Sequence, residues 1–202
     1  MAPRVALLAG IGLLALAGCR TTQVPAPIIG PGPGAPWAEQ RDALAKVTHY
    51  TLGGRVAVAA NGQGFSGALR YQQQQERRAD LAIDGPLGMG GVRVSVDGDQ
   101  VGISNSRGES FDGPAARAEL EQRLGFTLPL AELRWWLLGL PAPGEAALEQ
   151  DPVTGEIRAF QQNGWRVAID ARAAAMGFAL PQRLVVARDG ARMKVLIETW
   201  QP

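Results

Sequence analysis

The sequence is poor in the side chains that most often carry catalysis or bind metals. Its 202 residues include one cysteine and one histidine, and they contain no Gly-x-Ser-x-Gly, His-Glu-x-x-His or Walker motif. The single histidine, His49, has no cysteine partner and no acidic cluster beside it, so we interpret it as structural. We therefore predict no catalytic residue, no metal site and no free cofactor, which favours a binding protein over an enzyme.

An excess of charge of one sign is also missing. The chain has 20 Lys and Arg against 19 Asp and Glu, and the basic residues form no stripe along the sequence. Proteins that bind nucleic acid carry a basic patch, so this balance argues against a nucleic-acid partner.

No apolar run is long enough for a transmembrane helix, which takes about 20 residues. The longest run, 5–16, follows the basic Arg4 and ends in the tetrapeptide LAGC at 16–19. These are the proportions of a secretory signal, and the tetrapeptide resembles a bacterial lipobox. We predict a signal peptide over 1–18 and, on Cys19, covalent S-diacylglycerol and N-acyl groups. The alternatives are a plain signal peptide with a leftover cysteine, or a cytoplasmic protein with a buried N-terminal helix.

Proline and glycine dominate the residues that follow Cys19. This composition is too poor in apolar bulk to fold, so we predict that 19–36 form the lipidated cysteine and a tether. An extended tether of this length reaches up to about 50 Å. Arg20 is compatible with delivery to the outer membrane, because aspartate at this place retains many lipoproteins in the inner membrane. We expect a lipid-anchored protein on the periplasmic face of the outer membrane.

Hydrophobic periodicity predicts one domain over 37–202 with three helices and nine to eleven strands. Apolar spacing, proline starts and glycine ends place the helices within 36–50, at 115–124 and at 130–138. A sheet of so many strands must curl. We therefore predict a mainly β fold with some α, an open antiparallel β-barrel with helices over its open side. The clearest alternating segments are 55–60, 65–71, 79–83, 92–96, 101–103, 157–160, 165–170, 183–188 and 192–200.

The stretch DGPLGMGG at 84–91 places a large aliphatic side chain, Leu87, among turn-forming residues. Turns of this composition normally lie in water, where a leucine gains nothing. It is not a phosphate-binding loop, because no Gly-Lys-Ser/Thr follows and the next segment is a strand. We predict that Pro86 and Gly88 fix a tight turn that directs Leu87 outward. The alternative is that Leu87 folds back and plugs the core.

Three segments resemble the LolB family of outer-membrane lipoprotein receptors: LRWWLLGLP at 133–141, NGWRV at 163–167, and the final strand region at 180–200. With the lipobox and the Pro-Leu-Gly loop, the resemblance covers about residues 36–200. The chain departs from the family in its proline-rich tether and in Gly90-Gly91 after the loop.

The resemblance implies a helical lid that encloses an apolar cavity for acyl chains, lined by inward strand positions and by Leu130, Leu133, Trp136 and Leu137. It also implies a non-enzymatic receptor that accepts lipoproteins from the periplasmic carrier LolA and inserts them into the inner leaflet of the outer membrane. In the family, the loop leucine serves insertion, which gives Leu87 that role here. The expected partners are LolA, acylated lipoproteins and outer-membrane phospholipid, and we expect a monomer.

Two alternatives stay open at the level of sequence. The inward apolar residues could fill an ordinary dry core, which would fit an outer-membrane lipoprotein that scaffolds envelope assembly without a lipid cavity. A lipid-modifying enzyme is the third possibility, and the missing nucleophile and base disfavour it.

Overall fold

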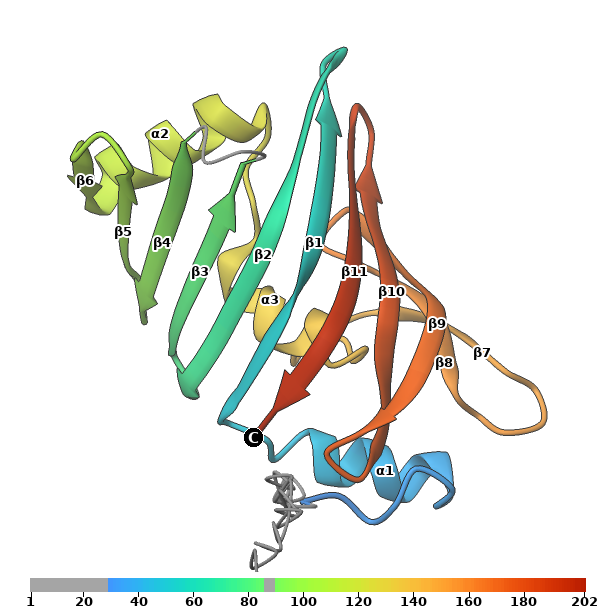
Figure 1. Ribbon diagram of the computed structural model, residues 1–202. Helices are drawn as coiled ribbons and strands as arrows, with labels where there is room; N and C mark the ends of the chain where they lie inside the picture. The colour runs from blue at the N-terminus through green and yellow to red at the C-terminus, as the bar shows by residue number, and fades with distance from the viewer. Residues whose placement is uncertain (1–28, 86–89) are drawn as a thin grey trace, which may run out of the picture.

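The computed structural model describes residues 29–85 and 90–202, which form one eleven-stranded antiparallel sheet and three helices (Figure 1). The strand order is β6-β5-β4-β3-β2-β1-β11-β10-β9-β8-β7, so β6 and β7 stand at the two edges. The sheet curls around a concave face without closing, which confirms the predicted open barrel. The strands are β1 (Tyr50–Ala60), β2 (Gln63–Gln75), β3 (Arg78–Asp84), β4 (Gly91–Asp97), β5 (Gln100–Asn105), β6 (Ser110–Asp112), β7 (Ala147–Gln150), β8 (Ile157–Gln162), β9 (Trp165–Ala175), β10 (Phe178–Arg188) and β11 (Ala191–Gln201).

The helices of the described residues are α1 (Trp37–Leu44), α2 (Gly113–Leu124) and α3 (Leu130–Leu137). Because α2 and α3 connect β6 to β7, they cross the concave face from one edge of the sheet toward the other (Figure 1). The first helix, α1, lies at the lower end of the barrel, where it contacts β10. Across residues 29–85 and 90–202, no helix combines the length and apolar character that a membrane span requires.

Tight turns with positive φ fix the pairing of neighbouring strands. Asn61-Gly62 (φ 51° and 77°) joins β1 to β2, and Asn163-Gly164 (φ 52° and 76°) joins β8 to β9. Positive φ at both positions is the type I′ geometry, which matches the twist of a hairpin. Met176-Gly177 adopts the same geometry (φ 53° and 80°) between β9 and β10, without the asparagine that marks such turns in a sequence.

Aromatic side chains fill one side of the core more densely than the other. The Trp136 ring on α3 lies 6.4 Å from the ring of Phe160 and 6.4 Å from that of Trp165, measured between centroids. Its indole Nε1 donates a hydrogen bond to Oε1 of Gln162 at 3.0 Å. These aromatic residues belong to α3, β8 and β9. The inner face of β3 and β4 instead carries aliphatic residues such as Val94, which fill less volume.

The end of the predicted tether is part of the fold. The backbone N–H groups of Ile29 and Gly30 donate to the carbonyl of Met176, and Gly32 N–H donates to Gly177 O at 2.8 Å. The buried Gln40 side chain holds this segment in place from α1. Its Nε2 donates to the carbonyls of Ala35 (2.8 Å) and Pro33 (3.2 Å), and its Oε1 accepts from Ala179 N–H at 2.8 Å. Residues 29–36 are therefore a docked segment, while Cys19 and the rest of the predicted tether lie outside the described residues.

Replacing Gln40 by leucine will release the docked segment 29–36, because three hydrogen bonds of one buried side chain are lost. We expect the free energy of unfolding to fall by about 1–3 kcal/mol. Proteolysis within the segment should become faster. Denaturant unfolding and limited proteolysis measure the two effects. Gln122→Leu, which alters an exposed glutamine on α2, is the matched control. Cleavage at the wild-type rate in Gln40→Leu would show that this glutamine does not hold the segment.

Candidate functional site

An apolar cavity of about 260 Å³ lies between the concave face of the sheet and helices α2 and α3. Valine, leucine, isoleucine and methionine side chains supply most of its wall. Ligand sites of proteins are typically concave, mostly apolar and few in number, which makes this cavity the candidate site. Buried strand residues in its wall include Val56, Val58, Leu69, Val94, Leu184 and Val195.

Periodicity explains how the sequence builds this wall. In β4, Val92 and Val94 face the cavity while the intervening Arg93 is exposed, because alternate side chains of a strand point to opposite faces. In α2, Leu120 and Leu124 face the cavity at a spacing of four residues. Such a spacing keeps both side chains on one face of a helix.

The structure brings three of the four predicted cavity residues to the wall. Leu133, Trp136 and Leu137 line the cavity from α3, and each is at most 9% exposed. Leu130 is half-buried and packs against the core one helical turn earlier, outside the lining. The sequence pattern does not single out Leu120 or Leu124 of α2, whereas the alternation in each strand indicates which strand residues face inward.

The cavity opens toward the end of the sheet where β3 and β4 are joined. Phe65, near the start of β2, is a lining residue with 40% of its surface exposed. Ile83 and Val92 also line the cavity, are only half-buried and pair directly across β3 and β4. One pair further on, the strands end at Asp84 and Gly91. The predicted insertion residues Pro86, Leu87 and Gly88 belong to the connection between these strands and lie outside the described residues.

Tyrosine hydroxyls supply polar atoms on the buried side of this region. The Tyr71 hydroxyl, on a lining residue, donates to Oε1 of the buried Gln73, and the Tyr50 hydroxyl donates to the carbonyl of Arg134 at 2.8 Å. Burial raises the pKa of both hydroxyls above the ordinary value of 10.0. Both therefore remain neutral, and neither brings a charge to the cavity at physiological pH.

Arg134 joins α3 to the end of α1. It is 7% exposed, and its Nη2 donates to the carbonyl of Val47 at 3.2 Å. Its guanidinium carbon also lies 4.4 Å from the centroid of the Trp135 ring, within reach of a cation–π interaction. These contacts direct its charge away from the apolar wall and hold α3 over the sheet.

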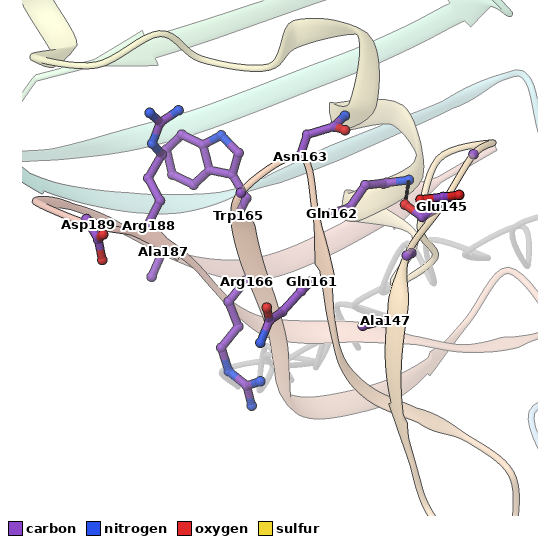
Figure 2. Close-up of a pocket in the computed structure, with 13 residues that line it drawn as sticks. Glu145, Ala147, Gln161, Gln162, Asn163, Trp165, Arg166, Ala187, Arg188 and Asp189 are labelled. Atoms are coloured by element: carbon purple, nitrogen blue, oxygen red, sulfur yellow. Dashed lines mark hydrogen bonds between the residues drawn. The ribbon is translucent and has the colours of Figure 1, made fainter.

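A second depression, at the turn between β8 and β9, is larger and open to solvent, with a volume of about 1120 Å³ (Figure 2). Polar and charged side chains surround it. Figure 2 shows Arg188 beside the Trp165 ring, with 5.1 Å between the guanidinium carbon and the ring centroid. Arg166 on β9 forms an ion pair with Glu149 on β7, across the intervening β8. We assign the candidate site to the smaller cavity, because its enclosed and mostly apolar wall is typical of ligand sites. Among the residues that the structure describes, no group of three or more His, Cys, Asp and Glu is placed to hold a metal ion.

Fold and cavity together define the class of this protein, an open half-barrel whose connecting helices enclose an apolar cavity. The chain belongs to the LolB family, because residues 48–200 match the family described as "Outer membrane lipoprotein LolB". This result confirms the resemblance inferred from the sequence. The protein is accordingly an outer-membrane lipoprotein with a role in lipoprotein localisation.

Relatives named "Outer-membrane lipoprotein LolB" match nearly the whole chain. That of Stutzerimonas stutzeri is 32% identical, over 97% of this chain and 95% of the relative. That of Nitrosococcus oceani is 31% identical, over 95% and 94%. Among solved structures, a LolA-superfamily protein from Nitrosomonas europaea has a TM-score of 0.47 and 9% identity, over 76% of this chain and 85% of that one.

The free energy of unfolding will fall as pH rises above about 10, where unfolded tyrosines lose their protons. Because the folded pKa values of Tyr50 and Tyr71 are raised, their contribution is fully present below pH 10 and is lost above it. Denaturant titrations from pH 8 to 11 measure this loss, and Tyr71→Phe should make it smaller. These are the two tyrosines of the chain, so phenolate absorbance reports on them alone. Ionisation near pH 10 in the folded protein would contradict the prediction.

Proposed function

We propose that this protein receives acylated lipoproteins from the periplasmic carrier LolA, holds their acyl chains in the apolar cavity, and inserts them into the inner leaflet of the outer membrane. The single observation that carries the proposal is an enclosed apolar cavity, open at one end, in a member of the LolB family. The protein acts as a monomer without catalysis. Residues 1–18 are its signal peptide, and Cys19, diacylated and N-acylated, anchors it through the tether.

The free energy of hydrocarbon burial explains why such a carrier needs a cavity. Each methylene moved out of water contributes about 0.8 kcal/mol, so three acyl chains of about fifteen methylenes amount to roughly 35 kcal/mol. A ligand of this kind cannot pass through water between two proteins at a useful rate. If the cavity of the carrier and the cavity of this protein open toward each other, the acyl chains stay out of water during transfer. Affinity then needs to rise only modestly at each step.

The size of the cavity implies that α2 and α3 move when cargo enters. A volume of about 260 Å³ lies below the range of roughly 300–1,000 Å³ that is usual for a drug-sized ligand. Three acyl chains need more room than this. The sheet is held by continuous hydrogen bonding across eleven strands, whereas α2 and α3 pack on it mainly through side chains. We therefore expect α2 and α3 to move away from the sheet when cargo enters, while the sheet keeps its shape.

The decisive experiment offers the soluble domain a loaded LolA carrier and measures transfer of a radiolabelled lipoprotein. The wild-type domain should accept the cargo, and Val56→Phe should accept less, because its larger ring occupies the cavity. Ala57→Phe adds the same ring on the exposed face of β1 and is the matched control. Melting temperatures establish that both variants fold.

Transfer failing for the wild-type domain would overturn the proposal. Saturable binding of an uncharged fluorescent probe separates the remaining alternatives, because a lipoprotein that only scaffolds envelope assembly, with a filled core, gives no saturable signal.

For membrane insertion we propose Leu87, in the connection between β3 and β4. The cavity-lining pair Ile83 and Val92 lies close to the base of that connection, where Gly85 N–H donates to Gly90 O at 3.2 Å. The connection that includes Leu87 therefore begins and ends beside lining residues of the cavity. Full burial of the Leu87 side chain in lipid contributes about 1.5–3 kcal/mol, which biases the mouth toward a bilayer without anchoring the domain.

Leu87→Glu should leave folding and uptake from LolA nearly intact and block release into liposomes, because a carboxylate does not enter hydrocarbon. Two assays on one preparation measure this, uptake from the loaded carrier and incorporation into vesicles. Leu87→Ile, which keeps an aliphatic side chain, is the control. An equal loss of uptake and release would assign Leu87 to a plug of the core instead.

A further inference from the structure

One charged side chain belongs to the wall of the apolar cavity. Of the described lining residues, Arg123 alone carries a charge, and it stands in the last turn of α2. Its side chain is 33% exposed. Arginine can lay its hydrocarbon stem along an apolar surface while its guanidinium stays in water. Arg123 therefore reaches the rim of the cavity. The end of its helix is held at the turn between β1 and β2 by the bond from Asn61 Nδ2 to Gly125 O, close to the start of β2 where Phe65 is exposed.

Two carboxylates hold this guanidinium in place. Nε of Arg123 donates to Oε1 of Glu119, one helical turn earlier, and Nη2 lies 2.6 Å from the same oxygen. Nη2 is also 3.8 Å from Oε2 of Glu109, in the turn between β5 and β6. Asn105 Nδ2 donates to that Glu109 oxygen and fixes the turn. The rim thus presents one oriented cation flanked by two anions that come from different elements.

The local potential at the rim disfavours an anionic ligand. Glu109 and Glu119 together outweigh the single positive charge of Arg123. The end of α2 adds the partial negative charge of its last carbonyl groups. A guanidinium nevertheless has five N–H donors, more than its bonds to Glu119 consume. A neutral group with strong acceptor oxygens can therefore bind here, whereas a phosphate meets two carboxylates.

We propose that Arg123 donates hydrogen bonds to the neutral ester and amide carbonyls at the head of the acylated ligand, while Glu109 and Glu119 exclude lipids whose head carries a phosphate. The proposal rests on the function proposed above and adds a specificity determinant to it. Phospholipids share the acyl chains of a lipoprotein, so the apolar wall alone cannot distinguish them. A protein at a phospholipid surface binds its cargo selectively only if residues at the mouth of the cavity distinguish the head group of the cargo from that of a phospholipid.

The test compares two ligands with identical chains, a dipalmitoyl-cysteinyl peptide of no net charge and dipalmitoyl phosphatidylglycerol. Each displaces the uncharged probe N-phenyl-1-naphthylamine from the soluble domain. Wild type should prefer the lipopeptide. Arg123→Met keeps the stem and should weaken lipopeptide binding about tenfold, as expected for a lost hydrogen bond to a charged group. The double variant Glu109→Gln with Glu119→Gln should bind phosphatidylglycerol more tightly than wild type does.

Arg117→Met is the matched control, because Arg117 lies on α2 and bonds to the carbonyl of Asp99 outside the cavity. Affinity for the probe itself checks that each variant keeps a folded cavity, and Arg123→Lys should recover part of the lipopeptide affinity. If Arg123→Met weakens both ligands equally, or weakens neither, Arg123 is only a surface arginine of α2 and the proposal is wrong. If the wild-type domain binds neither ligand nor the probe, the function proposed above fails instead.

Discussion

The pairing of β1 with β11 is the interaction on which the rest of the structure depends. The strands β1 to β6 form one half of the sheet and β7 to β11 form the other, and among the described strands β1 and β11 are the pair that joins the two halves along a seam. The register runs from Thr51 opposite Gln201 to Ala60 opposite Ala191. Beyond the last pair, Asn61 N–H donates to Gly190 O at 3.2 Å and closes the upper end of the seam. The seam joins the first strand of the domain to its last, so the sheet is complete only when the whole chain is present.

This seam also dictates where α2 and α3 lie. With the first and last strands at the centre, the middle of the chain must travel from β6 at one edge to β7 at the other. The short route crosses the concave face, and the apolar residues of both helices find their partners there. Asn61 Nδ2 holds the end of α2 by donating to Gly125 O, and Gln162 holds Trp136 of α3 from β8. The cavity is the space that remains between this crossing and the concave face of the sheet.

Much of this architecture was predictable because its signals are local in the sequence. Two-residue periodicity marked the strands, and Asn61-Gly62 and Asn163-Gly164 marked two of the hairpins. The Met176-Gly177 turn carries no such mark, since a methionine with positive φ is imposed by the pairing of β9 and β10. The docked segment 29–36 has a tether's composition, and its order comes from Gln40, a residue that looks like any exposed helix position.

The candidate site was less predictable than the fold for a related reason. Helical spacing placed Leu133, Trp136 and Leu137 on one face of α3, and they line the cavity. Leu130 shares that face but lies beyond the cavity's edge, which depends on where the sheet curls. The sequence around Arg123 does not indicate its position at the cavity. That position depends on the fold, which brings Arg123 close to Glu109 in the turn between β5 and β6 and to the apolar wall.

The docked segment 29–36 determines which end of the barrel an N-terminal anchor would hold. It attaches at the turn between β9 and β10, whereas the cavity opens at the opposite end, where β3 meets β4 (Figure 1). The eleven residues of β1 separate these poles by about 36 Å. A membrane attachment ahead of residue 29 therefore holds the pole opposite the cavity mouth, so a domain that stands upright on such an attachment turns its mouth away from the membrane.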